Sequence, residues 1–574
     1  MLPSQQLAQF VADSKQLEAL CRELGRRGAT VHLKELVGGA LSFYAAAAIA
    51  RCGGLHIFVA EDRDAAAYLL NDFYNLLDES RICFFPSSYK RSIAYGGEDA
   101  QGVVQRTAAL AALRAHDDGY TVVCTYPEAL AERVADAETL RRDTIRVAVG
   151  DRTSPEVLVD ALVDAGFEKV DFVYEPGQYS LRGGIVDVFS FAESKPYRVD
   201  FFGDEVDSIR RFEISSQLSS DKLDHIEILP DLTAAASPSE RVSLARFAGE
   251  EATFWFFDAD FVLRRINDLR RKVVADLDDP KRIDSLLTSR NGLLSDIGGG
   301  RIFMLRDNLK ERPADAEVLF STAPQPAFNK NFALLADDMI RNGLRGYETY
   351  ILSENRAQME RLSNIFHQIG RGQVVVRPLA LTLHEGFVDN DLKLCLYTDH
   401  QIFDRYQRYR INGEIKRDEQ MTIAELNQLR PGDYVVHIDH GVGRFDGLVK
   451  ITENGKTHEA IKLVYKDGDV LFVNVHSLHR ISRYKSGDGE PPKVYKLGTG
   501  AWQKLKNAAK KAVKDISREL IALYAKRKAS KGFAFSPDSY LQHELEASFR
   551  WEDTPDQQAA TAAVKRDTGA DQPR

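Results

Sequence analysis

The sequence contains little cysteine, no long apolar run and no excess of positive charge. Its cysteines are scattered and form no Cys-x-x-Cys pair: Cys21, Cys52, Cys83, Cys124 and Cys395. Scattered thiols in odd number predict a reducing compartment and argue against a disulfide framework or a zinc site. No apolar run reaches transmembrane length, and the first residues lack the plan of a signal peptide. We therefore expect a cytoplasmic protein with no metal site and no membrane partner.

The overall charge and the order of predicted elements define the class of protein. A formal net charge of −9 gives no global nucleic-acid signature, so any such contact must come from local patches. Strands are expected at Thr30–Lys34, Leu55–Ala60 and Thr121–Thr125, with an alanine-rich helix at Leu41–Arg51 between the first two. Because such alternation predicts a mainly parallel sheet, we expect an α/β multidomain protein.

A phosphate-binding loop would lie after the first of these strands, in the segment ELVGGALSFYAAAAIA. Gly38 and Gly39 are present, but Leu41 occupies the position of the lysine and Ser42 that of the hydroxyl residue. A working loop needs the lysine to reach the β- and γ-phosphates. We interpret this segment as a degenerate phosphate loop that binds no nucleotide, and we expect no catalytic residue in it.

Residues 174–217 predict a small antiparallel meander. On its second strand, alternation gives one face to the core, with Tyr197, Val199 and Phe201. The other face carries Arg198, Asp200 and Phe202, and an aromatic beside an arginine on a solvent face is typical of a protein-binding hot spot. The alternative is that Phe202 packs under a loop and Arg198 pairs with Asp200.

A second β-rich segment, LRPGDYVVHIDHGVGRFDGL followed by AIKLVYKDGDVLFVNVHSLHRISRY, predicts a small barrel. Its short apolar strands are separated by turns, one of them at Asp467-Gly468. The size is that of a Tudor or SH3-like barrel. His437, Asp439 and His440 suggest a metal site, but no further ligand is near, so we favour a hydrogen-bonded barrel corner.

These blocks resemble known domains. YEPGQYSLRGGIVDVF followed by YRVDFFGDEVDSIRRF resembles the UvrA-binding domain of the excision-repair protein UvrB and of the bacterial transcription-repair coupling factor family. The barrel block resembles the domain of that family that interacts with RNA polymerase, which CarD-type regulators share. A UvrB-like helicase subunit and a CarD-like regulator are the alternatives. Leu41 and the barrel argue against the first, and the second leaves the meander unexplained.

The resemblance implies a function and its residues. The family's UvrA-contacting positions fall on Arg182, Arg198 and Phe202. The strand that pairs with the β subunit of RNA polymerase matches Leu448–Thr452, where we expect the contact at Ile451, with Val449 and Leu448 beside it. The chain is then a scaffold that binds stalled RNA polymerase and recruits UvrA for transcription-coupled nucleotide excision repair.

The resemblance also divides the chain. We expect a degenerate NTPase-like α/β domain at 1–143, an inserted β-rich α+β UvrA-binding domain at 144–231, completion of the UvrB-like first module at 232–344, a small α/β domain at 345–413, a linker at 414–428, the CarD/Tudor-like barrel at 429–497, a relay helix at 498–531 and the start of a helicase motor at 532–574. The relay segment is a basic amphipathic helix, which we interpret as a packed connector; membrane or DNA binding is the alternative.

The last block, FRWEDTPDQQAATAAV, resembles the entry of a superfamily-two helicase, in which a glutamine at the position of Gln557 reads adenine. No GxxxxGK[ST] motif or DExH box follows it. The full-length family hydrolyses ATP with Mg and moves on double-stranded DNA through that motor. We expect these 574 residues to be no enzyme and to need neither ATP nor Mg as cofactors.

Overall fold

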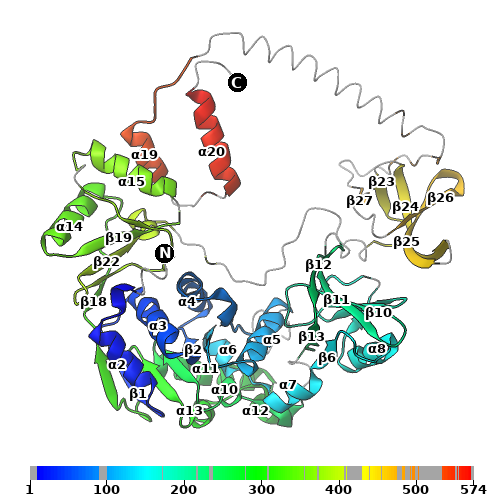
Figure 1. The fold of residues 1–574 in the computed structure, drawn as a ribbon, viewed down its shortest axis with the longest axis horizontal. Coiled ribbons are helices and arrows are strands. Elements are labelled where there is room, and N and C mark those ends of the chain that lie inside the picture. The colour runs from blue at the N-terminus through cyan, green and yellow to red at the C-terminus, as the bar shows by residue number, and fades with distance from the viewer. Residues whose placement is uncertain are drawn as a thin grey trace. The chain divides into compact units, whose positions relative to one another are not determined.

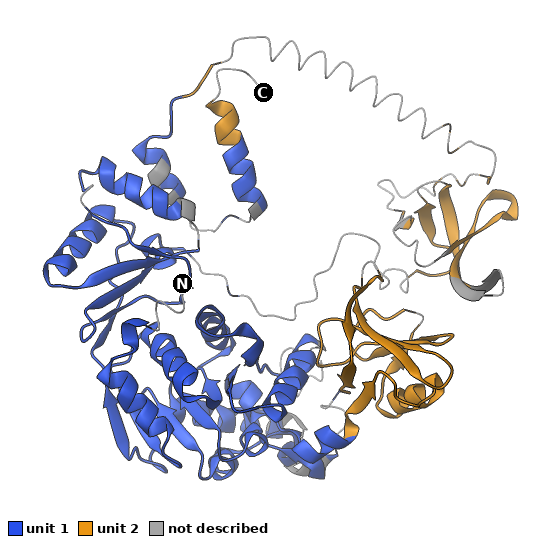
Figure 2. Cartoon of the chain, in the orientation of Figure 1, with its two compact units in different colours: residues 1–142, 231–413, 536–563 blue, residues 143–230, 414–535, 564–574 orange. Residues whose placement is uncertain are grey.

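A computed structural model provides the structure of the chain. It describes residues 9–89, 100–170, 172–214, 217–231, 237–277, 280–306, 309–354, 356–371, 374–405, 409, 429–437, 440–453, 456–474, 481–484, 492, 494, 496–497, 502, 504, 533–547, 549, 553 and 555–569. The linker predicted at 414–428, Asp439 and most of the relay segment lie outside this range. The chain forms two compact units: residues 1–142, 231–413 and 536–563, and residues 143–230, 414–535 and 564–574 (Figure 2).

The first unit contains a seven-stranded parallel sheet (Figure 1). Its strands, in spatial order, are β17 (Ala316–Leu319), β1 (Thr30–Lys34), β16 (Arg301–Met304), β15 (Thr253–Phe256), β2 (Gly54–Val59), β4 (Tyr120–Thr125) and β3 (Ile82–Phe84). Phe254, Trp255 and Phe256 are each 0% exposed, as expected for a parallel strand covered on both faces. The α/β prediction is confirmed, and β15, β16 and β17 from the 232–344 segment lie in the same sheet as β1 to β4.

Helices accompany this sheet. They are α2 (Lys15–Leu24), α3 (Ala40–Cys52), α4 (Arg63–Leu76), α5 (Ala100–Arg114), α6 (Pro127–Ala131), α7 (Ala137–Asp143), α10 (Leu244–Ala248), α11 (Ala259–Leu277), α12 (Pro280–Leu286) and α13 (Arg290–Ile297). Two short strands, β5 (Val134–Ala135) and β14 (Arg241–Val242), pair antiparallel beside them. The alanine-rich run after β1 forms α3 as predicted, since alanine is the strongest helix former.

A smaller mixed sheet completes the first unit. Its strands, in order, are β18 (Thr322–Pro324), β21 (Phe387–Asp389), β22 (Leu394–Thr398), β19 (Glu348–Leu352) and β20 (Pro378–Leu379). They are accompanied by α14 (Phe332–Leu344), α15 (Arg356–Gln368) and α16 (Asp399–Ile402). From much later in the chain, α19 (Tyr540–Ala547) lies beside α15, where Arg361 and Glu546 form an ion pair of 3.1 Å (Figure 1).

The second unit holds the meander and the barrel. The meander sheet runs β12 (Ser219–Leu223), β11 (Val206–Phe212), β10 (Tyr197–Phe201), β9 (Ile185–Val188), β8 (Gln178–Arg182) and β7 (Glu168–Lys169), with α8 (Pro155–Asp164) and the antiparallel pair β6 (Ile145–Ala148) and β13 (His225–Ile228). Tyr197 and Val199 are buried, as the alternation predicts.

The barrel sheet is antiparallel throughout. Its strands, in order, are β26 (Val470–Asn474), β25 (Lys456–Val464), β24 (Gly441–Glu453), β23 (Tyr434–His437) and β27 (Ile481–Arg483). Asp467 has φ of 63° and Gly468 of 82°, the left-handed backbone that the predicted Asp-Gly turn requires. A last helix, α20, spans Pro555–Thr568.

Candidate protein-binding surfaces and the degenerate phosphate loop

A buried ion-pair network lies in the meander. Arg198 stands opposite Asp187 on the neighbouring strand and binds it through two donors on one edge of the guanidinium, Nε to Oδ1 at 2.7 Å and Nη2 to Oδ2 at 2.9 Å. Arg182, at the end of β8, donates to the same carboxylate. Asp187 is 0% exposed. Two guanidinium groups therefore compensate one fully buried carboxylate, the arrangement that a buried charge requires.

Aromatic rings cover both arginines. The guanidinium carbon of Arg182 lies 4.6 Å from the centre of the Phe172 ring, and that of Arg198 lies 4.4 Å from the centre of the Phe212 ring. Arg198 also donates to the backbone oxygen of Gln217 at 3.1 Å. Burial alone would lower the pKa of Arg198, but the hydrogen bonds and charge of Asp187 raise it above its ordinary value.

The prediction that Arg198 lies on a solvent face is wrong, because its side chain is only 12% exposed. The alternative pairing of Arg198 with Asp200 is also not the one observed. Asp200 instead accepts a hydrogen bond from Ser208 at 2.9 Å and pairs with Arg210 at 3.1 Å. Sequence alternation could not show that Asp187 of the neighbouring strand and the Phe212 ring lie against the Arg198 side chain.

Phe202, in contrast, is 84% exposed. It lies directly after β10, at the turn into β11, where its amide donates to the oxygen of Glu205 at 2.9 Å and Gly203 adopts φ of 64°. The alternative that Phe202 packs under a loop is contradicted. The hairpin thus presents a phenyl ring to solvent at the end of an ion-paired sheet, a geometry suited to an interface anchor.

The predicted polymerase-binding segment forms the second half of β24. Leu448, Val449 and Ile451 stand opposite Ile461, Ala460 and His458 of β25. On its other edge, β24 pairs with β23 only between Gly441 and Arg444. Within the described part of the barrel, no strand pairs with that other edge beyond Arg444. The backbone groups of such an edge can pair with a strand from a partner.

The barrel corner with histidines shows no metal-site geometry in the described residues. His437 is 4% exposed, and its ring centre lies 4.8 Å from that of His440. Asp439 lies outside the described range. Across the described part of the chain, no three histidine, cysteine, aspartate or glutamate side chains form a group that could hold a metal ion.

The degenerate phosphate loop is occupied by the chain itself. Gly38 has φ of 57°, and a methyl group added to Gly39 would overlap the backbone oxygen of Glu385. The hydroxyl of Ser42 donates to Asp72 at 2.6 Å, and the same carboxylate accepts the amide of His384 at 2.6 Å. Asp72 therefore joins the loop to residues 382–386, which we call the plug segment. Burial raises the pKa of Asp72 to about 7.

Further hydrogen bonds fix the plug segment. The oxygen of His384 lies 2.8 Å from Nε2 of His400, and the amide of Gly386 donates to Gln401 at 2.7 Å. The His384 ring stacks on Tyr68, with the ring centres 3.8 Å apart. The two glycines of the loop thus permit close approach of the protein's own backbone. Sequence reasoning missed this role, because nothing in the loop itself identifies a partner more than 300 residues away.

A cavity of about 480 Å³ remains beside the plug segment. Its described lining includes Leu41, the carboxylates of Glu35, Glu61 and Glu385, and Arg306, but no lysine. Leu41 is 2% exposed, so its side chain belongs to the core. Carboxylates repel a triphosphate, and the Ser42 hydroxyl already donates its hydrogen bond to Asp72. These residues therefore do not fit ATP with Mg. Gln557 lies apart from this loop in sequence, exposed in the first turn of α20, and its adenine-reading role stays a prediction.

Comparison with known proteins agrees with both β-rich segments. The model of the UvrB interaction domain matches residues 145–233, and that of the CarD-like/TRCF RID domain matches residues 429–485. Across 98% of its length, the chain is 25% identical to the transcription-repair-coupling factor of Bacillus subtilis. It is 26% identical, across 88% of its length, to the factor of Staphylococcus haemolyticus. The chain spans about half the length of these relatives, 54% and 49% respectively.

Among the described helices, none combines the length and the apolar composition that crossing a membrane requires.

The two matched domains occur in the order predicted from the sequence, and each argues against one of the two alternative functions. A CarD-like regulator does not account for the first domain, and a UvrB-like helicase subunit does not account for the second. The predicted resemblance is confirmed: this chain combines a UvrB interaction domain with a CarD-like/TRCF RID domain and is similar along almost its whole length to transcription-repair-coupling factors.

Proposed function

We propose that this chain is a scaffold that binds UvrA through its meander and the β subunit of RNA polymerase through its barrel. It would thereby bring nucleotide excision repair to a stalled polymerase. The observation that carries the proposal is the presence of both matched domains in one chain. Each domain has an element suited to binding a partner. In the meander this element is the Phe202 hairpin, and in the barrel it is the half-open strand β24.

On the UvrA side, Phe202 supplies the apolar contact. Its exposed ring can be buried against a partner without disturbing the core of the meander, whereas Arg182 and Arg198 are committed to Asp187. In this proposal the arginines act in two ways. They lock β8, β9 and β10 together beneath the hairpin, and they place positive charge close to the surface that carries Phe202.

On the polymerase side, backbone pairing supplies the contact. An unpaired strand edge offers N–H and C=O groups in a fixed register, to which a strand of the partner can add. Leu448, Val449 and Ile451 lie on the segment of β24 with such an edge. The β26 edge at the other side of the sheet presents Phe472, which is 47% exposed, and serves as the comparison edge.

Nucleotide chemistry has no part in the proposed role of these domains. In support, the plug segment lies against Gly39, and Leu41 is buried where a working phosphate loop needs a lysine. The use of ATP and Mg for movement on double-stranded DNA, with a glutamine at the position of Gln557 reading adenine, is assigned in this proposal to the motor of full-length relatives. The scaffold itself is no enzyme and needs no cofactor.

Two matched pairs of variants test the proposal. Calorimetric titration against UvrA compares Phe202→Ala with Leu218→Ala, a second apolar side chain of the same domain that is 69% exposed. We expect a loss of about 1–4 kcal/mol for the first and under about 0.5 kcal/mol for the second. Capture on immobilised RNA polymerase compares Ile451→Arg with Phe472→Arg, and only the first should weaken binding. Equal behaviour within either pair would refute the corresponding interface.

A further inference from the structure

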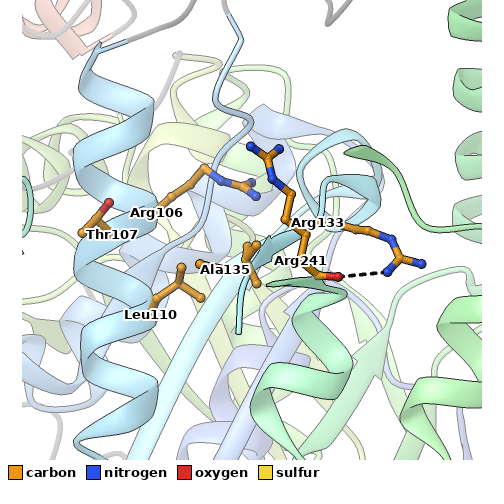
Figure 3. Close-up of a pocket in the computed structure, with 7 residues that line it drawn as sticks. Arg106, Thr107, Leu110, Arg133, Ala135 and Arg241 are labelled. Atoms are coloured by element: carbon orange, nitrogen blue, oxygen red, sulfur yellow. Dashed lines mark hydrogen bonds between the residues drawn. The ribbon is translucent and has the colours of Figure 1, made fainter. Parts of the chain in front are cut away.

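A hollow in the first unit is lined by three arginines from separate elements (Figure 3). Arg106 lies on α5, Arg133 directly precedes β5, and Arg241 begins β14. The pairing of β5 with β14 sets Arg241 opposite Ala135 and so brings the last two arginines together. The remaining lining residues are Thr107, Leu110, Val134 and Ala135. None of the 7 lining residues carries a carboxylate.

Arg106 is the most buried of the three, at 3% exposure. Its Nη1 donates to the backbone oxygens of Pro86 at 2.8 Å and Ala129 at 3.3 Å, and the guanidinium lies over the Phe85 ring at 4.1 Å. Glu132 approaches it at 3.3 Å, but that carboxylate also accepts the amide of Ser88 at 3.0 Å and its hydroxyl at 2.7 Å. The Nη2 of Arg106 is buried and has no hydrogen-bond partner.

Arg133 repeats this pattern. Its Nη1 donates to the backbone oxygen of Arg241 at 3.1 Å, which Figure 3 marks, while its Nε is buried without a partner. Each of these two arginines therefore has one buried donor that lacks an acceptor in the protein. In Figure 3 the Arg133 side chain extends away from Arg106, and the Arg241 side chain extends toward it. A buried, unpaired donor is costly, and more so when the group is charged, so a bound acceptor would stabilise the hollow.

We propose that this hollow binds a phosphate group, with Nη2 of Arg106 donating to one of its oxygens and Arg133 and Arg241 adding positive charge. A tetrahedral oxyanion offers several acceptors at once, and the planar guanidinium fork matches it. The enclosed part of the hollow measures about 10 Å³, which admits one oxygen-sized atom. One phosphate oxygen would enter while the rest of the group lies at the open mouth. The group can belong to free phosphate or to a nucleic-acid backbone.

Titration of inorganic phosphate into the full chain tests this site, with sulfate as a second oxyanion. The variants Arg133→Gln and Arg241→Gln remove charge at the hollow. Arg265→Gln is the matched control, because Arg265 is a half-exposed arginine of the same unit that pairs with Glu128. We expect saturable binding that is at least about tenfold weaker in both hollow variants, since each loses one positive charge, and unchanged in the control. Circular dichroism of all four proteins checks the fold.

Two results would overturn the proposal: no saturable binding of millimolar phosphate by the unaltered chain at low salt, or equal affinity in all four proteins. A short DNA duplex then separates the two sources of the phosphate. Displacement of phosphate by the duplex, with duplex affinity falling in the hollow variants, assigns the group to a nucleic-acid backbone. Retention of phosphate in the presence of the duplex assigns it to a free phosphate. Either result keeps the hollow as a phosphate site.

Discussion

Replacing Arg198 by alanine should loosen the meander itself and not only alter its surface. Asp187 is 0% exposed and is held by two guanidinium groups, so truncation of Arg198 leaves it with Arg182 alone. Removing one partner of a buried ion pair typically costs about 3–5 kcal/mol. Because Arg182 keeps part of the compensation, we expect a loss of about 2–3 kcal/mol. Arg198→Lys should cost less, since it keeps the charge but loses the two-pronged geometry.

Amide hydrogen exchange of β9 and β10 in the full chain measures this loss locally. A decrease of about 2–3 kcal/mol corresponds to exchange faster by about 30- to 150-fold where the amides exchange through opening of the meander. Phe202→Ala is the control. Its ring is 84% exposed, so its removal should leave exchange in β9 and β10 unchanged while UvrA affinity falls.

If Arg198→Ala loses UvrA binding but keeps wild-type amide exchange in β9 and β10, the structural reasoning is refuted. Arg198 would then contact UvrA directly, and its ion pair with Asp187 would not stabilise the meander. Accelerated exchange with intact UvrA binding would show instead that the network is structural and lies outside the interface. The expected result is the loss of both properties.

Three further predictions concern the degenerate phosphate loop. Gly39→Ala should destabilise the first unit by about 1–3 kcal/mol in urea unfolding, because the methyl group overlaps the Glu385 oxygen, whereas Gly343→Ala, with open space around it, should not. The folded-state pKa of Asp72, about 7, lies above its ordinary 3.8, so its contribution to stability is full below pH 4 and falls as pH rises to 7. The side-chain amide of the Asp72→Asn variant cannot titrate. Between pH 4 and pH 7 the free energy of unfolding of the wild type should therefore fall by on the order of 4 kcal/mol relative to that variant. A constant difference between the two proteins would contradict the raised pKa of Asp72. Equilibrium dialysis should find no ATP binding, and binding abolished by a Gly38 substitution would overturn this prediction.

The parts of the fold that depend on local pattern could be predicted from the sequence. Alternating apolar strands and an alanine-rich helix indicated the parallel sheet, and the antiparallel meander predicted at residues 174–217 forms there. The Asp-Gly turn and the exposure of Phe202 follow from equally local rules. In each case the signal lies within a few residues of its consequence.

The contacts that build the candidate sites join residues that are far apart in the sequence or on different strands, and the sequence alone did not reveal them. Asp72 meets His384 across 312 positions, so the role of Gly38 and Gly39 is visible only once the plug segment is in place. The pairing of Asp187 with Arg198 depends on register between two strands, and it overrode the expectation that Arg198 faces solvent. The arginine hollow likewise depends on the pairing of β5 with β14.

The central claim is that one chain connects UvrA to RNA polymerase, and a bridging assay tests it most directly. RNA polymerase is immobilised through a subunit other than β, UvrA is added with or without the chain, and retained UvrA is quantified. We predict that UvrA is retained only when the chain is present, and that both Phe202→Ala and Ile451→Arg reduce retention while Leu218→Ala does not. If the chain binds each partner separately but never retains UvrA on the polymerase, the scaffold account is contradicted.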